Sequence, residues 1–418
     1  MASRADWLNV SGRLEQYEEI LGRETVDELR LVADRVRDRR LQNINSTPVG
    51  GGVAEILTRM IPMLNELGVE ASWDVIKGDQ AFFDVTKAFH NALHGKVERV
   101  TPEMFDVYRA TLEENLRTMD FNGDVILLHD PQPAGLIQRK QEIGRRWVWR
   151  CHIDVSAPQA DVWEFLRPYV EQYDAAVFSM PEFSQQLSIP QYLVAPSIDP
   201  LSDKNKELEP EQVDRVLEKY GIDRERPLLI QISRFDRLKD PLGVIAAYRM
   251  VKKRQPCQLV LAGGGAPDDP EGEQVLREVQ EAAAGDPDIH VLLLPPFSDL
   301  EINALVRAST VVFQKSLKEG FGLTVSEALW KRKPVIGGAV GGIKQQIIEG
   351  VTGFLVYSVE GAATRAAQLL ADEQMRRTIG ENGHLHVKQN FLLTRHVKDY
   401  MLIMLALEHP REHIVYLD

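Results

Sequence analysis

Two glutamates and the glycines between them have the types and spacing needed to hold a sugar nucleotide. Glu319 and Glu327 are separated by seven residues, and glycine stands at 320 and 322. The apolar run at 310–316 predicts a strand, so Glu319 is expected in a loop at a strand's carboxyl end, where open parallel sheets place ligands. A helix expected from Thr324 would offer free N–H groups to an anion. One carboxylate would then bind sugar hydroxyls, the amides a diphosphate, and Glu327 a ribose diol. Acids at the start of a surface helix are the alternative.

Two cations follow another predicted strand of the same half. Arg234 and Lys239 lie five residues apart, directly after the apolar run at 227–233. Both are expected at the same sheet edge as Glu319, where they could neutralise a diphosphate. Solvated surface cations are the alternative interpretation, because most charged side chains in loops face water. The shared position with the Glu319 loop favours the diphosphate site.

A glycine cluster marks the first half of the chain. Gly50, Gly51 and Gly52 follow a predicted strand and precede an amphipathic helical pattern. Three glycines allow a backbone to approach a phosphate or a sugar closely, although a tight structural turn would also use them. The segment matches neither the G-x-x-x-x-G-K-[ST] phosphate loop nor the G-x-G-x-x-G dinucleotide fingerprint. Mononucleotide kinases and dinucleotide dehydrogenases are therefore disfavoured.

Polar residues also close two predicted strands of the first half. His129 and Asp130 follow one apolar run, and His152 and Asp154 follow the next. All four are expected at the edge that carries the glycine cluster, where they could bind sugar hydroxyls or orient a reacting group. Buried, hydrogen-bonded histidines are the alternative. The spacing does not support a metal site, since no H-x-x-x-H or close carboxylate pair is present.

The elements that must position these residues form two successive series. Apolar runs at 41–46, 70–76, 124–130, 146–153, 175–180 and 192–197 alternate with helical segments and predict a doubly wound α/β domain. A polar, proline-containing segment from Ser197 is the expected linker. A second series follows, with runs at 227–233, 257–263, 289–294, 310–316 and 334–338. Alternation that restarts after a linker favours two Rossmann-like domains over one eight-stranded barrel.

The expected domain limits follow from this pattern. Residues 1–200 would form the first Rossmann-like domain, with a charged helical extension before its first strand. Residues 201–393 would form the second, and residues 394–418 a terminal helix that returns to the first domain. Asp240 is expected to cap a helix that Pro241 opens.

Composition limits the classes of partner. Lys and Arg number 49 against 62 Asp and Glu, so the formal charge of −13 argues against nucleic acid as a ligand. Cys151 and Cys257 are far apart and predict neither a disulfide framework nor a zinc site. Neither a secretory signal pattern nor an apolar run of membrane-spanning length is visible. The expected location is the cytoplasm, away from the membrane.

These motifs together resemble the retaining glycosyltransferases of the two-domain GT-B type. The E-x7-E element of the large sucrose-synthase-like family 4 is matched by Glu319 and Glu327, and its R-x4-K clamp by Arg234 and Lys239. The acceptor-side glycine loop is matched by Gly50 to Gly52, and the inter-domain histidine by His152. Longer segments are similar to the trehalose glycosyltransferring synthases, namely 45–57, 84–95, 129–137, 149–156, 196–205 and 318–337.

The resemblance implies a GT-B fold, with the two domains facing each other across a cleft, and a specific reaction. Glucose would pass from a nucleoside diphosphate glucose to free glucose, giving α,α-trehalose with retention. Arg234 and Lys239 would stabilise the leaving diphosphate, Glu327 would hold the ribose, and His152 would lie near the glycosidic bond. The donor sugar would contact Glu319 and the amides of Gly320, Phe321, Gly322, Leu323 and Thr324.

The same resemblance implies small-molecule partners and no obligatory cofactor. Mg²⁺ is compatible with such a donor, but no protein-bound ion is expected, and a homodimer is compatible with the family. Trehalose phosphorylase, of the same fold, is the main alternative, because inorganic phosphate could occupy the Arg234 and Lys239 site. A sugar-phosphate acceptor is disfavoured, since the acceptor-side motifs lack a cationic cluster. A nucleotide-sugar-binding regulator without turnover is the alternative from another class.

Overall fold

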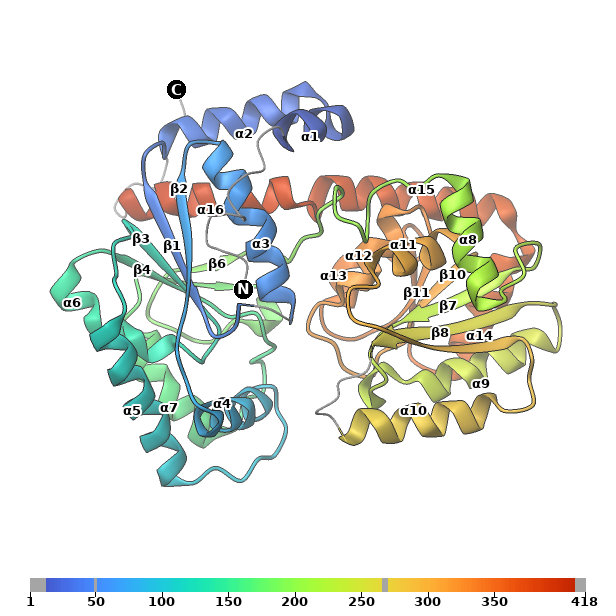
Figure 1. Cartoon of the computed structure of the whole chain (residues 1–418), viewed down its shortest axis with the longest axis horizontal. Coiled ribbons are helices and arrows are strands. Elements are labelled where there is room, and N and C mark those ends of the chain that lie inside the picture. Colours follow the sequence, from blue (N-terminus) through green and yellow to red (C-terminus); the bar gives the residue numbers. More distant parts are fainter. Residues whose placement is uncertain (1–12, 49–50, 265–269, 410–418) are drawn as a thin grey trace. The chain divides into compact units, whose positions relative to one another are not determined.

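The chain folds into two compact units, each built around one parallel sheet. The computed structural model describes residues 13–48, 51–264 and 270–409. The first unit comprises Met1–Pro196 and Leu393–Asp418, and the second comprises Ser197–Leu392. Within the described residues each unit holds a six-stranded sheet with helices on its faces (Figure 1). Both sheets are open, which confirms the predicted pair of Rossmann-like domains and excludes a single closed barrel.

The sheet of the first unit has the order β2-β1-β3-β4-β5-β6, and every neighbouring pair is parallel. Strand β3 is buried along its whole length, as its unbroken apolar run predicts for a sheet covered on both faces. The strands are β1 (Arg40–Asn45), β2 (Glu70–Val75), β3 (Val125–His129), β4 (Arg146–Arg150), β5 (Ala175–Phe178) and β6 (Gln191–Leu193). The helices are α1 (Arg13–Leu21), α2 (Arg23–Arg35), α3 (Gly51–Glu66), α4 (Gln80–Leu93), α5 (Pro102–Thr118), η1 (Ala134–Arg139), α6 (Lys140–Ile143), α7 (Ala160–Val170), η2 (Pro181–Phe183) and α16 (Leu393–Glu408).

The sheet of the second unit has the order β12-β11-β10-β7-β8-β9 and is also parallel throughout. Asp240 caps α9 as predicted, because its carboxylate accepts from the Gly243 N–H. The strands are β7 (Leu228–Ile232), β8 (Gln258–Gly264), β9 (Ile289–Leu294), β10 (Val311–Gln314), β11 (Val335–Gly338) and β12 (Gly353–Val356). The helices are α8 (Pro210–Tyr220), η3 (Arg237–Lys239), α9 (Pro241–Lys252), α10 (Pro270–Ala283), α11 (Asp299–Ala308), α12 (Leu323–Trp330), α13 (Ile343–Gln346), α14 (Val359–Ala371) and α15 (Glu373–Asn390).

The polar segment after Ser197 differs from an open linker. The chain enters the second unit at its start. Asn205 is buried there, and the buried Lys331 donates to its side-chain oxygen at 2.8 Å. Arg307 donates to the Asn205 carbonyl at 3.1 Å. The polar composition of this segment thus correctly indicated where one unit ends and the next begins. The segment is not an open linker, because specific hydrogen bonds hold it against the rest of the second unit.

The charged extension at the start of the chain packs against the last helix. One face of α2 buries Val26, Leu29 and Val32, and α2 contacts α16 in the first unit. Glu28 on α2 pairs with Lys398 on α16, with 3.0 Å between the charged atoms. The extension, for which the sequence suggested no role, therefore covers α16.

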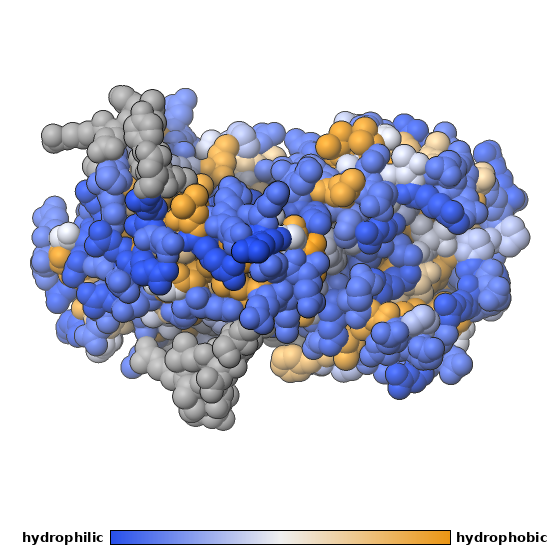
Figure 2. Space-filling model, turned by 90° about the horizontal axis from the view of Figure 1, so that it is seen from above, coloured by the Kyte–Doolittle hydropathy of each residue, from blue (hydrophilic) through white to orange (hydrophobic). Residues whose placement is uncertain are grey.

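Hydrophilic residues form most of the molecular face that Figure 2 shows, and the hydrophobic residues on this face lie in separate groups. Among the helices of the described residues, none has the length and apolar character needed to span a bilayer.

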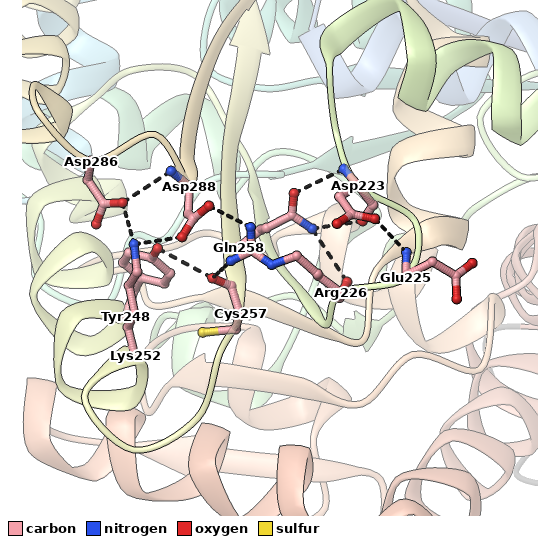
Figure 3. Close-up of polar contacts among 9 residues, drawn as sticks. All are labelled: Asp223, Glu225, Arg226, Tyr248, Lys252, Cys257, Gln258, Asp286 and Asp288. Atoms are coloured by element: carbon pink, nitrogen blue, oxygen red, sulfur yellow. Dashed lines mark hydrogen bonds and ion pairs between the residues drawn. The ribbon is translucent and has the colours of Figure 1, made fainter.

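A network of charges joins three strands at the amino edge of the second sheet (Figure 3). Asp288, just before β9, accepts from Arg226 at 2.6 Å and pairs with Lys252 at 2.8 Å. Arg226 precedes β7 and also donates to the Cys257 carbonyl before β8. Hydrogen bonds from Arg226 and Lys252 hold the pKa of Asp288 well below its ordinary value. The network therefore stabilises the register of β7, β8 and β9.

Replacing Asp288 by asparagine is expected to lower the free energy of unfolding by about 1–2 kcal/mol at pH 7. A carboxyl whose folded pKa is depressed stabilises the fold above its unfolded pKa of about 3.9, and that contribution is lost as pH falls below it. The difference between wild type and Asp288→Asn should stay constant from about pH 5 to 8 and shrink below about pH 4. Urea unfolding across this range measures it. Asp214→Asn, which breaks an exposed pair with Arg224, is the control and should change stability little.

Candidate functional site

A lysine and a glutamate meet at the carboxyl edge of the second sheet. Lys239 ends η3 after β7, and Glu319 lies in the loop after β10. Their charged atoms, Lys239 Nζ and Glu319 Oε2, are 2.6 Å apart, and the two side chains are 17% and 10% exposed. Gln314 Nε2 and Ser316 Oγ donate to the same carboxylate oxygen, each at 3.1 Å. Three donors thus fix the Glu319 carboxylate: one from the loop after β7, one from the last residue of β10 and one from the loop after β10.

Backbone contacts join these two loops. The Leu317 N–H donates to the Leu238 carbonyl at 2.7 Å, and Gln231 Nε2 donates to the Lys239 carbonyl at 3.0 Å. Arg234 is placed differently, because 66% of its side chain is exposed and its ion-pair neighbour is Asp236 at 3.7 Å. The structure therefore brings Lys239 against Glu319 and leaves the Arg234 guanidinium accessible to solvent.

A second glycine pair supports the loop that follows Glu319. Gly322 has a φ of +79°, which suits glycine, and it caps α12. The Gly342 N–H donates to the Gly320 carbonyl at 2.9 Å. A Cβ at Gly341 would stand 1.7 Å from the Glu319 carbonyl oxygen. Gly341 and Gly342 lie outside the motifs singled out in the sequence, and their approach in space gives them a role in shaping the Glu319 loop.

The remaining residues of the motif lie in this loop and in α12. Phe321 is buried against the ring of Phe391, and Leu323 begins the helix, whose first N–H groups lack partners within it. Thr324 Oγ1 donates to Gln314 at 2.9 Å, which links α12 to β10. Glu327 is buried one turn further on.

A buried lysine lies one turn beyond Glu327. Lys331 Nζ donates to the Glu327 carbonyl at 3.0 Å. Burial lowers the pKa of Lys331 to about 7, against the opposing charge of Glu327. Lys331 is therefore held against the backbone of Glu327 within the second unit.

Two histidines meet at the carboxyl edge of the first sheet. His129 ends β3, and its Nδ1 lies 3.0 Å from Nε2 of His152, which follows β4. Their rings stack with 5.3 Å between centroids. Asp130 adopts a left-handed φ of 68°, and its carboxylate accepts from the His152 backbone N–H at 2.8 Å. Asp154 accepts from the Ser156 N–H and so closes its own turn.

Burial keeps the two imidazoles neutral. It lowers the pKa of His129 to about 3, with a further contribution from the nearby Arg150, and it lowers the pKa of His152 well below its ordinary value. Burial also raises the pKa of Asp130 to about 6. The edge therefore presents uncharged rings, which suits contact with an uncharged sugar.

This neutrality predicts an acid-sensitive fold. A histidine with a depressed folded pKa takes a proton only in the unfolded chain below about pH 6.5, so unfolding becomes easier by about 1.4 kcal/mol per pH unit. His129→Gln should reduce the slope of stability against pH by that amount between about pH 6 and 4.5. Asp130 changes the slope in the opposite direction in both proteins. Urea unfolding at several pH values measures the slopes, and equal slopes would contradict a neutral His129.

Several residues of this edge escaped sequence reasoning. Arg150 is fully buried at the end of β4 and donates to Ser179 Oγ and the Val194 carbonyl. Asn43 in β1 contacts His129 at 3.1 Å. His396 on α16 lies close enough to lower the pKa of His152. The sequence offered only a weak signal, since Asn43 is one of several polar residues in β1 and Arg150 is the last residue of β4.

The glycine cluster lies between β1 and α3. Gly51 and Gly52 begin α3, and Gly50 lies outside the described residues. No cluster of three or more His, Cys, Asp or Glu residues suited to a metal ion occurs in the part of the chain that the structure describes.

Family models match both units. Residues 43–185 match the model "Trehalose synthase, N-terminal domain", and residues 212–386 match "Glycosyl transferases group 1". Among solved structures, sucrose-phosphate synthase from Thermosynechococcus elongatus has a TM-score of 0.70 at 18% identity, covering 89% of this chain and all of that one. Anabaena HepE in complex with UDP and glucose has a TM-score of 0.66 at 15% identity, covering 88% of this chain and 99% of that one. These likenesses support the GT-B fold.

Curated relatives extend over nearly the whole chain. Trehalose synthase from Thermococcus litoralis is 45% identical over 399 residues, which cover 93% of this chain and 96% of the relative. Trehalose phosphorylase from Pleurotus pulmonarius is 29% identical, covering 90% of this chain but only 58% of that protein. With the two parallel-sheet units, the identity to trehalose synthase supports trehalose-related glycosyl transfer. The chain belongs to the trehalose synthase family of GT-B glycosyltransferases.

Proposed function

We propose that the enzyme transfers glucose from a nucleoside diphosphate glucose to the anomeric hydroxyl of free glucose, forming α,α-trehalose with retention. The observation that carries the proposal is the pairing of Lys239 with Glu319 at a sheet edge, beside the glycine loop and the start of α12. This arrangement combines a cation, a carboxylate and free amides within one unit. The cation and the amides suit the diphosphate of a nucleoside diphosphate sugar, and the carboxylate suits its sugar hydroxyls.

Each donor-side residue has a part in the proposed reaction. Lys239 has three N–H donors, so it can keep its contact with Glu319 and still donate to the diphosphate. Arg234, with its exposed guanidinium, would clamp the same diphosphate. Glu319 and the amides from Gly320 to Thr324 would hold the donor sugar, and Glu327 would accept from the ribose. The cations act where charge grows as the sugar departs.

The proposed bond changes need no protein nucleophile. The bond between glucose C1 and the diphosphate oxygen breaks, and the acceptor oxygen attacks C1 from the same face. The departing phosphate oxygen takes the acceptor proton, so the nucleoside diphosphate leaves as the second product. His152, Asp130 and Asp154, with Gly51 and Gly52, would hold the sugars in the first unit. No cofactor beyond the donor is required, and a glycosyl adduct trapped on Glu319 would overturn this route.

Trehalose phosphorylase is the second candidate, supported by the 29% identity to the Pleurotus protein. Trehalose is incubated with inorganic phosphate in one tube and with ADP, UDP or GDP in others. The proposed transferase forms a nucleoside diphosphate glucose in the latter tubes. Glucose 1-phosphate in the phosphate tube alone would establish the phosphorylase instead, and absence of turnover in every tube would favour a binding protein.

The forward reaction tests the donor and the stereochemistry. ADP-, UDP- and GDP-glucose are each mixed with free glucose, and the products are followed by ¹H NMR. We expect α,α-trehalose from at least one donor. A β-linked disaccharide would contradict retention, and a product formed only from a sugar phosphate would contradict the acceptor.

A further inference from the structure

A chain of hydrogen bonds in the first unit begins at a group that can only accept. Asn43 in β1 is fully buried, and its side chain lies 3.2 Å from the Ser72 backbone carbonyl in β2. A carbonyl oxygen has no proton to donate, so the amide NH₂ of Asn43 must face Ser72. The amide oxygen of Asn43 therefore faces the other way, toward His129.

This orientation fixes the proton positions on both histidines. His129 Nε2 lies 3.1 Å from Asn43 Oδ1, so Nε2 must carry the proton. In a neutral ring Nδ1 then holds a lone pair, and it accepts from His152 Nε2 at 3.0 Å. With its proton on Nε2, a neutral His152 keeps a lone pair on Nδ1. Since His152 remains partly exposed, that lone pair is available to a ligand.

We infer that Asn43 and His129 are positioning residues that make His152 a hydrogen-bond acceptor for a sugar hydroxyl. The assignment of the hydroxyl to a sugar rests on the proposed function, whereas the proton positions do not. An imidazole that only accepts distinguishes a hydroxyl, which can donate, from a phosphate oxygen, which cannot. At His152 the acceptor side would thus favour a sugar hydroxyl over a phosphate oxygen.

Imidazole ¹⁵N NMR tests the proton positions without activity. In the full chain labelled with ¹⁵N-histidine, His129 and His152 should both show the neutral Nε2–H pattern from pH 8 to pH 6. Their signals are assigned with His129→Gln and His152→Gln. Asn43→Leu should alter the pattern of His129 and of His152. Its control is Asn115→Leu, which removes another buried amide that bonds only to backbone groups and should alter neither. A proton on His152 Nδ1, or patterns unchanged in Asn43→Leu, would overturn the inference.

Steady-state kinetics test whether Asn43 affects the use of glucose through His152. Asn43→Leu should lower kcat/KM for glucose about tenfold while leaving KM for the nucleotide sugar unchanged. Asn43→Asp keeps an acceptor for His129 but loses the donor to the Ser72 carbonyl, so at pH 8 its kcat/KM for glucose should lie between those of wild type and Asn43→Leu. Its carboxylate favours a protonated His129, which can no longer accept from His152, so activity should fall with pH where wild type does not. Equal effects of Asn43→Leu and Asn115→Leu would overturn the positioning role.

The charges around the histidines make Asn43→Asp informative. Arg150 from β4 acts on both rings, His396 from α16 acts on His152, and the Asp130 carboxylate accepts from the His152 backbone N–H. Arg395 and Tyr400 of α16 lie next to His396. The fully buried Arg150 opposes protonation and is unchanged in every variant. An enzyme that makes no trehalose but keeps both Nε2–H patterns would refute the proposed function and leave the proton positions standing.

Discussion

Replacing Lys239 by alanine is expected to lower kcat/KM for the nucleoside diphosphate glucose by about 10²–10³-fold. The ammonium would stabilise charge that develops on the leaving diphosphate, and it also holds Glu319 through the contact of 2.6 Å. Both kcat and donor affinity should fall, because the side chain orders the loop before reaction and acts during it. Initial rates with varied donor at saturating glucose measure the two effects.

Arg237→Ala is the matched control for that experiment. Arg237 is a cation of the same short helix, but it pairs with Glu278 on α10 at 2.8 Å. Its removal changes the charge of the loop without touching Glu319, so the rate should change little. Full activity in Lys239→Ala with unaltered donor affinity would contradict the proposed clamp.

Gly341→Ala should abolish most transfer activity and destabilise the second unit by about 2–4 kcal/mol. The new Cβ would lie 1.7 Å from the Glu319 carbonyl oxygen, and the backbone φ of +46° disfavours any side chain. The loop that carries Glu319 must therefore move, since neither backbone can yield without losing its hydrogen bonds. Urea unfolding and initial rates measure the two losses.

Gly350→Ala separates the clash from the backbone strain. Gly350 has a φ of +72° in the same unit, and a Cβ added there would meet no atom within 4 Å. Alanine at this position should cost about 1 kcal/mol, with transfer activity retained. If Gly341→Ala behaves like Gly350→Ala in both measurements, the close packing of Gly341 against Glu319 does not govern the site.

Recognition of strands from the sequence did not follow their burial, since the largely exposed β6 was predicted and the mostly buried β12 was not. Strand β3 is apolar throughout, and the position of His129 at its end followed directly. Strand β12, with only Gly353–Val356, went unrecognised because its four residues include a glycine and adjoin turn residues. Its burial comes from pairing with β11, which no local pattern records.

The sequence predicted which sheet edge carries each candidate residue, but it did not predict the contacts between these residues. Parallel strands bring Lys239 and Glu319 to one edge, but their direct contact depends on the loop joined by Leu317 and Leu238. The chain from Asn43 to His129 spans 86 positions, so neither residue signals the other locally. Local sequence patterns thus predict the part of the fold in which each candidate residue lies, whereas its contacts depend on packing between distant segments.

Because α16 belongs to the first unit, the two units are expected to complete folding at different times during synthesis. The second unit is one continuous stretch, Ser197–Leu392, whereas the first needs residues from Leu393 onward. On the ribosome the second unit can fold as soon as it emerges, while the first waits for its last helix. His396 then completes the surroundings of the paired histidines. The second unit is therefore expected to mature before the first, although it is encoded after most of it.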